Sequence, residues 1–256
     1  MYLSKFDPDT GNRYYAWNRL SQESPGTGKK RLAGIPLRAA GLRFVVKRLN
    51  ISSVPAIAGI VGPVVVVVGD LAASLNTPGY SIVRDSISSL ALTPIGWLQS
   101  IGFLAMGLLE VILVIGLFLD IRRARGFHAG MVLLALCGFV LLLIGAFRMD
   151  LADGPRTTEG IIHTVSSYGL GLLFPLAILS LAPSLKSDPD WRNLFVYTLV
   201  AGILALALIL GALLADQTGW FGLYERIIVA NAIVWIAVAA VHLLRLSWGR
   251  ETQAQP

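Results

Sequence analysis

Apolar runs of about twenty residues, separated by short polar segments, fill the chain from residue 51 onward. A helix rises about 1.5 Å per residue, so a run of that length crosses the roughly 30 Å hydrocarbon core of a bilayer. The pattern predicts six transmembrane helices at residues 54–75, 95–119, 128–147, 159–183, 190–215 and 223–246. We therefore expect an all-α fold, a six-helix transmembrane bundle with a flexible basic N-terminal tail.

Composition excludes a water-soluble domain. Hydrophobic residues make up 55% of the chain, charged residues only 14%, and the mean hydropathy is +0.69, whereas soluble domains carry about 25% charged residues. We expect a cytoplasmic basic tail at 1–50, partly disordered, a six-pass domain at 51–248 and a cytoplasmic tail at 249–256. Residues 38–51 have the pattern of a helix lying on anionic lipid, with an ordinary basic juxtamembrane anchor as the alternative.

The basic residues predict the orientation. On this layout, seventeen of the 21 Lys and Arg residues fall on the side of the N-terminal tail, and only Arg84, Arg148, Arg156 and Arg226 fall on the other side. Cytoplasmic loops are the ones enriched in Lys and Arg. We therefore expect a multi-pass protein of the cell membrane with both termini cytoplasmic. Its partner is the lipid bilayer rather than nucleic acid. Tyr80 and Trp191 are expected to be interfacial anchors.

Glu110 is the first candidate for chemistry, because it lies about 15 Å from the end of its predicted helix, near mid-membrane. No Lys or Arg occurs at that depth, so we expect the carboxyl group to be protonated or solvated. Tyr197 and Thr198 reach a similar depth and are candidate hydrogen-bond partners. The group is either a proton site or a neutral structural hydrogen bond.

The second candidate is a set of polar residues that the topology brings to the outer face. The three arginines are expected to neutralise Asp85, Asp150 and Glu225 and so to fasten the loops. A headgroup or small-anion site and a catalytic site are the alternatives. The full set is Asp70, Arg84, Asp85, Ser86, Ser88, Arg148, Asp150, Asp153, His163, Ser166, Glu225 and Arg226.

Neither a metal nor a cofactor is predicted for this set. It contains one histidine and no HExxH motif, and His128 and His242 fall on the opposite side of the membrane. Cys137, the single cysteine, has no partner for a CxxC motif. A metal-dependent hydrolase built on His163, Asp150 and Asp85 is therefore the weakest hypothesis.

Five short blocks of the sequence form a recognisable series, at residues 79–88, 96–97, 147–150, 160–163 and 222–226. In this order they resemble blocks of a known family of multi-pass prokaryotic membrane proteins, the domain of unknown function 998, and the likeness spans about residues 54–246. This resemblance implies a six-helix membrane domain and directs attention to the outer polar set. The family has no assigned activity, so the resemblance implies none for this chain.

The sequence leaves three functional hypotheses. The favoured one is a non-enzymatic binding or structural membrane protein with a polar cluster at the outer face. A proton-coupled transporter that uses Glu110 is the second, and the membrane-embedded hydrolase is the third.

Overall fold

The computed structural model describes residues 4–6, 13–15, 53–151, 153–215 and 219–253. The chain divides into two units, residues 1–41 and 42–256. In the first unit β1 (Ser4–Phe6) pairs antiparallel with β2 (Arg13–Tyr15). The hydropathy pattern did not predict this hairpin, because strands of three residues are too short to show an alternation. The proposed surface helix at 38–51 and its anionic-lipid partner lie outside the described residues, as does most of the tail expected to be disordered.

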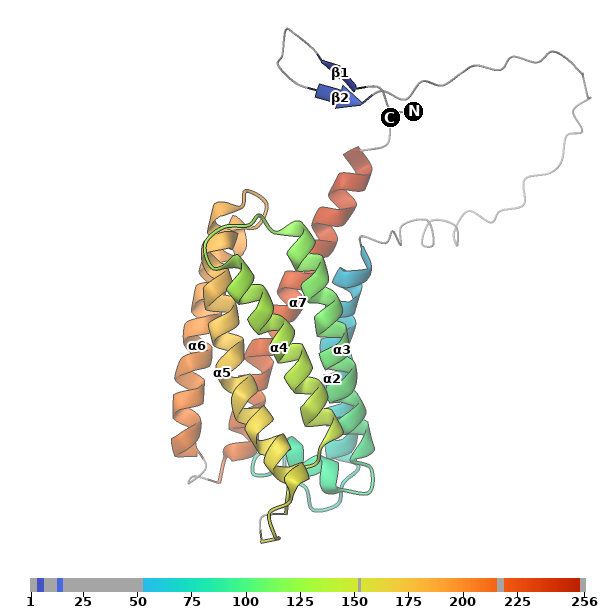
Figure 1. Ribbon diagram of the computed structural model, residues 1–256. Coiled ribbons are helices and arrows are strands. Elements are labelled where there is room, and N and C mark those ends of the chain that lie inside the picture. Colours follow the sequence, from blue (N-terminus) through green and yellow to red (C-terminus); the bar gives the residue numbers. More distant parts are fainter. Residues whose placement is uncertain (1–3, 7–12, 16–52, 152, 216–218, 254–256) are drawn as a thin grey trace, which may run out of the picture. The chain divides into compact units, whose positions relative to one another are not determined.

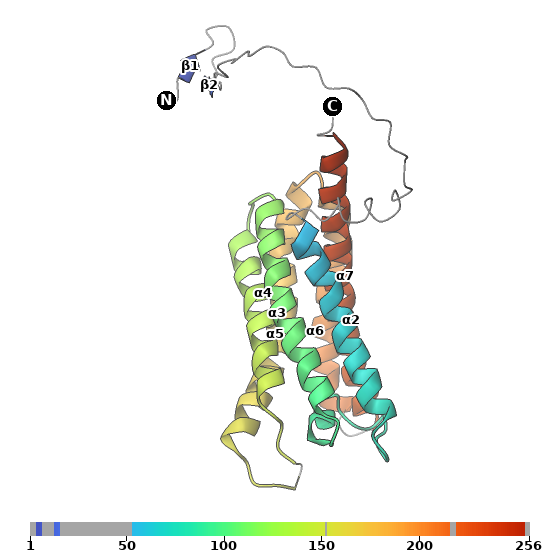
Figure 2. The ribbon, with the colours of Figure 1, turned by 90° about the vertical axis from the view of Figure 1, so that its right-hand side faces the viewer.

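The second unit is the helical bundle, shown in Figures 1 and 2. Among the described residues, six helices are long and apolar enough to cross a membrane, which confirms the predicted fold class of the membrane domain. They are α2 (Val54–Leu75), α3 (Trp97–Asp120), α4 (Phe127–Ala146), α5 (Thr158–Ser187), α6 (Phe195–Ala215) and α7 (Phe221–Gln253), joined in part by the short 3-10 helices η2 (Ser88–Leu92) and η3 (Arg192–Leu194). Helix α7 runs into the segment predicted to be a C-terminal tail.

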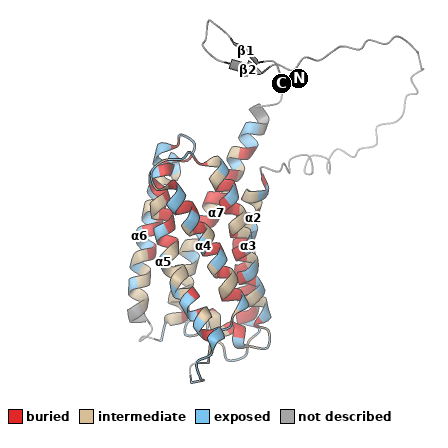
Figure 3. Ribbon diagram, in the orientation of Figure 1, coloured by how far each residue is buried: buried red, intermediate tan, exposed pale blue. Residues whose placement is uncertain are grey.

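Consecutive helices pack side by side, and α7 closes the bundle by packing against both α2 and α6. Buried residues recur along the helices of the bundle (Figure 3), and Leu113, Leu134 and Leu181 belong to one continuous core. Exposed apolar residues such as Val64, Leu108 and Ile203 cover the outside. An apolar exterior on an apolar core is the arrangement that lipid requires.

The two ends of the bundle differ in their connections. We call the end that carries the connection 76–96, the end of α4 and the start of α7 the Arg226 end. The end that carries the connections 121–126 and 188–194 and the last turns of α7 is the Arg250 end (Figure 1).

At the Arg250 end, aspartates hold the connections in place. The Asp120 carboxylate accepts a hydrogen bond from Nε1 of Trp191 at 2.9 Å and pairs with Arg250. Asp188 accepts the backbone N–H of Arg122 at 2.7 Å. Trp191 is only 1% exposed, so its predicted role as an interfacial anchor is wrong. The indole is buried because its N–H has an internal acceptor.

Gly126, which precedes α4, combines two constraints. Its φ is +81°, and a Cβ at this position would overlap with the carbonyl oxygen of Ser180 on α5. Gly79 has a similar φ of +78° but no atom within 4 Å of an added Cβ. The two glycines therefore separate the cost of a left-handed backbone from the cost of an overlap.

We expect Gly79→Ala to lower the free energy of unfolding in detergent by about 1 kcal/mol, which is the backbone cost. Gly126→Ala should lower it by about 1–3 kcal/mol more, because α5 must also move. Chemical denaturation of both variants measures the difference. Equal losses would show that α4 and α5 do not approach each other as closely as described.

Candidate functional site

The guanidinium of Arg226, in the second turn of α7, is the centre of the Arg226 end. Its Nε and Nη2 donate to the two carboxylate oxygens of Asp70 on α2 at 3.2 and 2.9 Å. Its Nη1 donates to the carbonyl oxygens of Ile82, Asp85 and Gly222 at 3.1, 3.2 and 3.1 Å. One side chain thus holds α2, the 76–96 connection and the start of α7 together.

Tyr80 completes this arrangement. Nη2 of Arg226 donates to the Tyr80 hydroxyl at 2.7 Å, and that hydroxyl donates toward the carbonyl oxygens of Asp85 and Ser86, at 3.1 and 2.8 Å. Burial raises the pKa of Tyr80, and the hydrogen bond from Arg226 opposes the rise. Nη2 of Arg226 also donates toward the Ser74 hydroxyl at 3.4 Å. We refer to the side chains of Asp70, Ser74, Tyr80 and Arg226, with the carbonyl groups of Ile82, Asp85 and Gly222, as the Arg226 network.

The start of α7 is also attached to backbone groups of the 76–96 connection. The Glu225 carboxylate accepts the N–H of Ile87 at 2.6 Å, and the N–H of Leu223 donates to the carbonyl of Val83 at 3.0 Å. Gly222 has to be small, because a Cβ there would overlap with the carbonyl oxygen of Asp85. Since Arg226 follows Gly222 by one helical turn, the guanidinium can fold back onto the same carbonyl groups.

A second polar group lies where α4 passes into α5. Asp150 accepts hydrogen bonds from the Thr157 hydroxyl at 2.7 Å and from its N–H at 3.1 Å, and these bonds lower the pKa of Asp150. The Thr157 hydroxyl oxygen in turn accepts the N–H of Gly160 at 3.0 Å, which caps α5. Glu159 accepts the N–H of Arg148 at 2.9 Å.

His163 lies in the second turn of α5, farther from the end of the bundle than Thr157. Its Nδ1 is 2.8 Å from the carbonyl oxygen of Phe147, and its Nε2 is buried with no hydrogen-bond partner in the described part of the chain. Ser166 is buried on the same helix, and Asp153 is exposed in the connection.

The predicted outer set therefore forms two groups rather than one cluster. The contact between them is the Ser86 hydroxyl, 4.0 Å from the Met149 sulfur. The Ser86 hydroxyl oxygen also accepts the N–H of Ser89 at 3.1 Å, just after Ser88, the first residue of η2.

The ion pairs expected within this set are not formed in the described ranges. Arg226 pairs with Asp70 instead of Glu225, and neither Arg84 nor Arg148 has an ion pair there. Asp85 and Asp150 accept hydrogen bonds from Ser81 N–H and from Thr157. Each carboxylate has a local hydrogen-bond donor a few residues away, which charge counting along the sequence does not reveal.

A metal centre is not assembled from these residues. Within residues 53–151, 153–215 and 219–253, no three His, Cys, Asp or Glu side chains lie together as a metal site requires. Asp85, Asp150 and His163 each have a separate local partner. The hydrolase hypothesis thus gains no support from the geometry.

Glu110 is 2% exposed in the middle of α3, and both of its carboxyl oxygens lack a hydrogen-bond partner in the described part of the protein. The hydrogen bond expected from Tyr197 or Thr198 is wrong. Helix α6 packs mainly against α5 and α7, and Thr198 accepts the Nε1–H of Trp235 at 3.0 Å. Equal depth in the membrane does not make two helices neighbours. Gln99 is also fully buried, and its side-chain amide has no hydrogen-bond partner among the described residues. The sequence pattern did not identify this residue.

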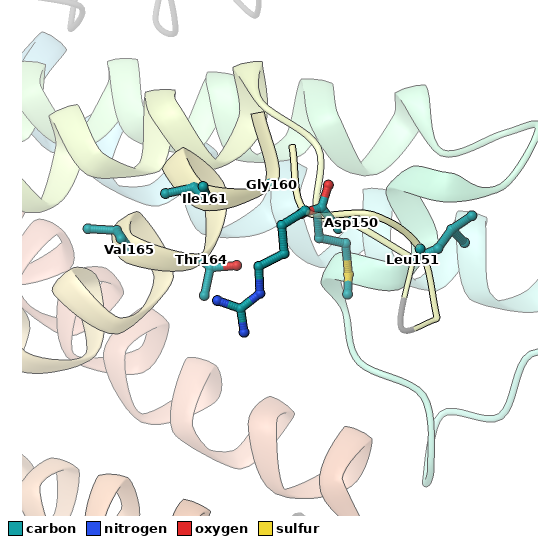
Figure 4. A pocket seen from close by; sticks show the side chains of 9 residues that line it. Asp150, Leu151, Gly160, Ile161, Thr164 and Val165 are labelled. Carbon is teal, nitrogen blue, oxygen red and sulfur yellow. The ribbon is translucent and has the colours of Figure 1, made fainter. Parts of the chain in front are cut away.

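An open pocket of about 330 Å³ lies beside the Asp150 group (Figure 4). Ile161, Thr164 and Val165 come from α5, and Leu151 lies on the opposite side of the pocket. The complete lining is Met149, Asp150, Leu151, Gly154, Arg156, Gly160, Ile161, Thr164 and Val165. Arg156 was used in the sequence analysis only to set orientation, and Thr157 and Glu159 were not considered. A Thr placed just before an apolar run is a capping signal that could have identified Thr157.

These features define a multi-pass helical membrane protein with a polar, hydrogen-bonded end. The family model described as protein of unknown function (DUF998) matches residues 60–242, so the chain belongs to this family. No curated protein matches the chain. No solved structure matches it either.

We expect Asp70→Asn to be the most damaging conservative change at the Arg226 end. It leaves a guanidinium that is only 14% exposed without its counter-charge, and breaking such pairs typically costs about 3–5 kcal/mol of stability. Arg84→Gln is the control, because Arg84 is exposed and should change stability by less than about 0.5 kcal/mol. Unfolding in detergent measures both variants, and similar values would mean that the Arg226 network does not stabilise the bundle.

Tyr80 gives a pH dependence. Its pKa in the folded protein is raised above the unfolded value of 10.0, so its stabilising contribution is complete below that pH and is lost as the pH rises through the folded pKa. We expect the stability advantage of the native protein over Tyr80→Phe to shrink above about pH 10. Unfolding curves of the two proteins across alkaline pH test this, and a constant difference would contradict it.

Proposed function

We propose that the protein is a non-enzymatic integral protein of the cell membrane, with both termini in the cytoplasm, whose Arg226 end binds the polar headgroup of a lipid at the outer surface. The observation that carries this proposal is the contrast between two arginines at that end. Arg226 is committed to internal acceptors, whereas Arg156 lines an open pocket and has no ion pair in the described part of the chain.

The orientation rests on the distribution of basic residues. The Arg250 end carries Arg122, Arg123, Arg125, Lys186, Arg192, Arg245 and Arg250, while the Arg226 end carries only four arginines. Of those four, Arg226 is neutralised by Asp70. The positive-inside rule then favours the Arg250 end in the cytoplasm.

The internal hydrogen bonds of Arg226 argue against a catalytic role for this residue, and we assign it a structural role beside the binding site. A guanidinium has five N–H donors, and those of Arg226 have seven acceptors within hydrogen-bond distance. It has no donor to spare for a substrate. The Arg226 network therefore acts as a rigid support, and a rigid support lowers the cost of forming an adjacent binding site.

Single cysteines test the orientation. We expect Asp153→Cys to react with a membrane-impermeant maleimide on intact cells, and Arg123→Cys to react only after permeabilisation, because the two exposed residues lie at opposite ends of the bundle. Native Cys137 is buried and serves as the background. The reverse labelling pattern would invert the proposal and place the pocket in the cytoplasm.

Lipid-dependent stability tests the binding role. We expect added phospholipid to raise the melting temperature of the purified protein in detergent. Arg156→Gln should lose most of that rise, because it removes the cation available to a phosphate. Arg84→Gln, at the same end but outside the pocket lining, should keep it. An equal response in both variants would show that lipid acts on the whole bundle and not at the pocket.

A second candidate is a proton-coupled transporter. The observation that favours it is the carboxyl group of Glu110 in the middle of α3, which has no hydrogen-bond partner among the described residues. An acid at this depth is costly unless it has a function or a neutral form. Proton flux into proteoliposomes should then be lost in Glu110→Gln and kept in Glu159→Gln, an exposed acid. Flux that survives Glu110→Gln removes this candidate.

A further inference from the structure

The pocket at the start of α5 carries two charges of opposite sign that do not neutralise each other directly. Asp150 and Arg156 both line it, yet no ion pair within 4 Å joins them in the described ranges. They are close enough to influence each other: the pKa of Asp150 is lowered first by its hydrogen bonds from Thr157 and then by the charge of Arg156. The pocket thus presents a separated anion and cation.

Asp150 is held in place by its surroundings. Two bonds from Thr157 fix the carboxylate, and Gly160 leaves it room, because a Cβ at that position would overlap with the carboxyl group (Figure 4). The position of the carboxylate is therefore fixed before a ligand binds, which reduces the entropic cost of binding.

Apart from Thr164, the side chains in the remaining wall of the pocket are apolar, and the apolar surface continues along the outer face of α5. Leu151, Ile161 and Val165 line the pocket and are exposed. Farther along α5, Tyr168 and Leu172 are also exposed, on the outside of a membrane-spanning helix. A molecule seated in the pocket therefore meets charges at one end and lipid at the other.

We propose that this pocket binds a zwitterionic phospholipid with a primary ammonium headgroup, of the phosphoethanolamine class. Arg156 takes the phosphate, Asp150 takes the ammonium group, and an acyl chain lies along Ile161 and Val165. The inference rests on the proposed headgroup-binding function and adds the class of lipid.

Two features select this class among phospholipids. A headgroup with a net negative charge and no ammonium group would leave Asp150 facing a phosphate, which is repulsive. A quaternary ammonium has no N–H to donate to a carboxylate and is usually bound by aromatic side chains, and the pocket lining contains no aromatic residue among those described. A primary ammonium donates directly to Asp150 in a charge-assisted hydrogen bond.

The experiment is titration of the protein in nanodiscs with phosphatidylethanolamine, phosphatidylcholine and phosphatidylglycerol, read by native mass spectrometry. The native protein should bind phosphatidylethanolamine at least about tenfold more tightly than the other two lipids, which corresponds to one charge-assisted contact. Asp150→Asn should abolish the preference for phosphatidylethanolamine over phosphatidylcholine. Arg156→Gln should weaken the binding of both lipids, and Arg84→Gln should change neither.

Thr157→Val controls for the structural role of Asp150, because it removes the side-chain hydrogen bond and keeps the carboxylate. This variant should bind phosphatidylethanolamine more weakly than the native protein, because the carboxylate is less well ordered. It should still prefer phosphatidylethanolamine to phosphatidylcholine, because the carboxylate is present. A preference for phosphatidylglycerol that depends on Arg156 would overturn the inference and leave the proposed function standing, whereas binding that ignores Arg156 would overturn both. A soluble glycerophosphoethanolamine that binds as tightly as the lipid would overturn the role assigned to the acyl chain.

Discussion

The burial of a guanidinium against a carboxylate between α2 and α7 is the interaction on which the Arg226 end depends. Asp70 interrupts an apolar helix and Arg226 lies in the second turn of another, and each is mostly shielded from water, with 16% and 14% of its side chain exposed. Separately, each charge would be expensive so close to hydrocarbon. Together they join α7 to α2, the contact that closes the bundle.

The carbonyl groups around Arg226 turn this pair into a support for the loops. Because Ile82 and Asp85 direct their carbonyl oxygens at the same guanidinium, the 76–96 connection needs little regular structure of its own. The two carbonyl oxygens accept hydrogen bonds from the Arg226 side chain, which meets the requirement that buried polar groups be hydrogen-bonded. The neighbouring α4–α5 connection is held by a separate set of hydrogen bonds, between Asp150 and Thr157, and the pocket lies beside it.

The functional proposal follows from which charges remain available. At the Arg226 end, the arginine with the most hydrogen bonds is the least able to bind a ligand, while Arg156 lines the pocket. The same distinction separates Glu225, whose carboxylate accepts the N–H of Ile87, from Glu110, which has no partner in the described part of the chain. Charge alone does not mark a site, because a satisfied charge is part of the architecture.

The sequence by itself determined the class of protein and its six candidate membrane spans, because the length and apolarity of a segment are local properties that decide whether a helix can cross a bilayer. It also singled out Arg226, Asp150 and Glu110 as residues of interest. Only the tertiary structure decided their partners: Asp70 for Arg226, Thr157 for Asp150, and Trp235 rather than Glu110 for Thr198. Such partners depend on which helices lie side by side and on backbone groups, and in a uniformly apolar bundle the hydropathy pattern contains neither.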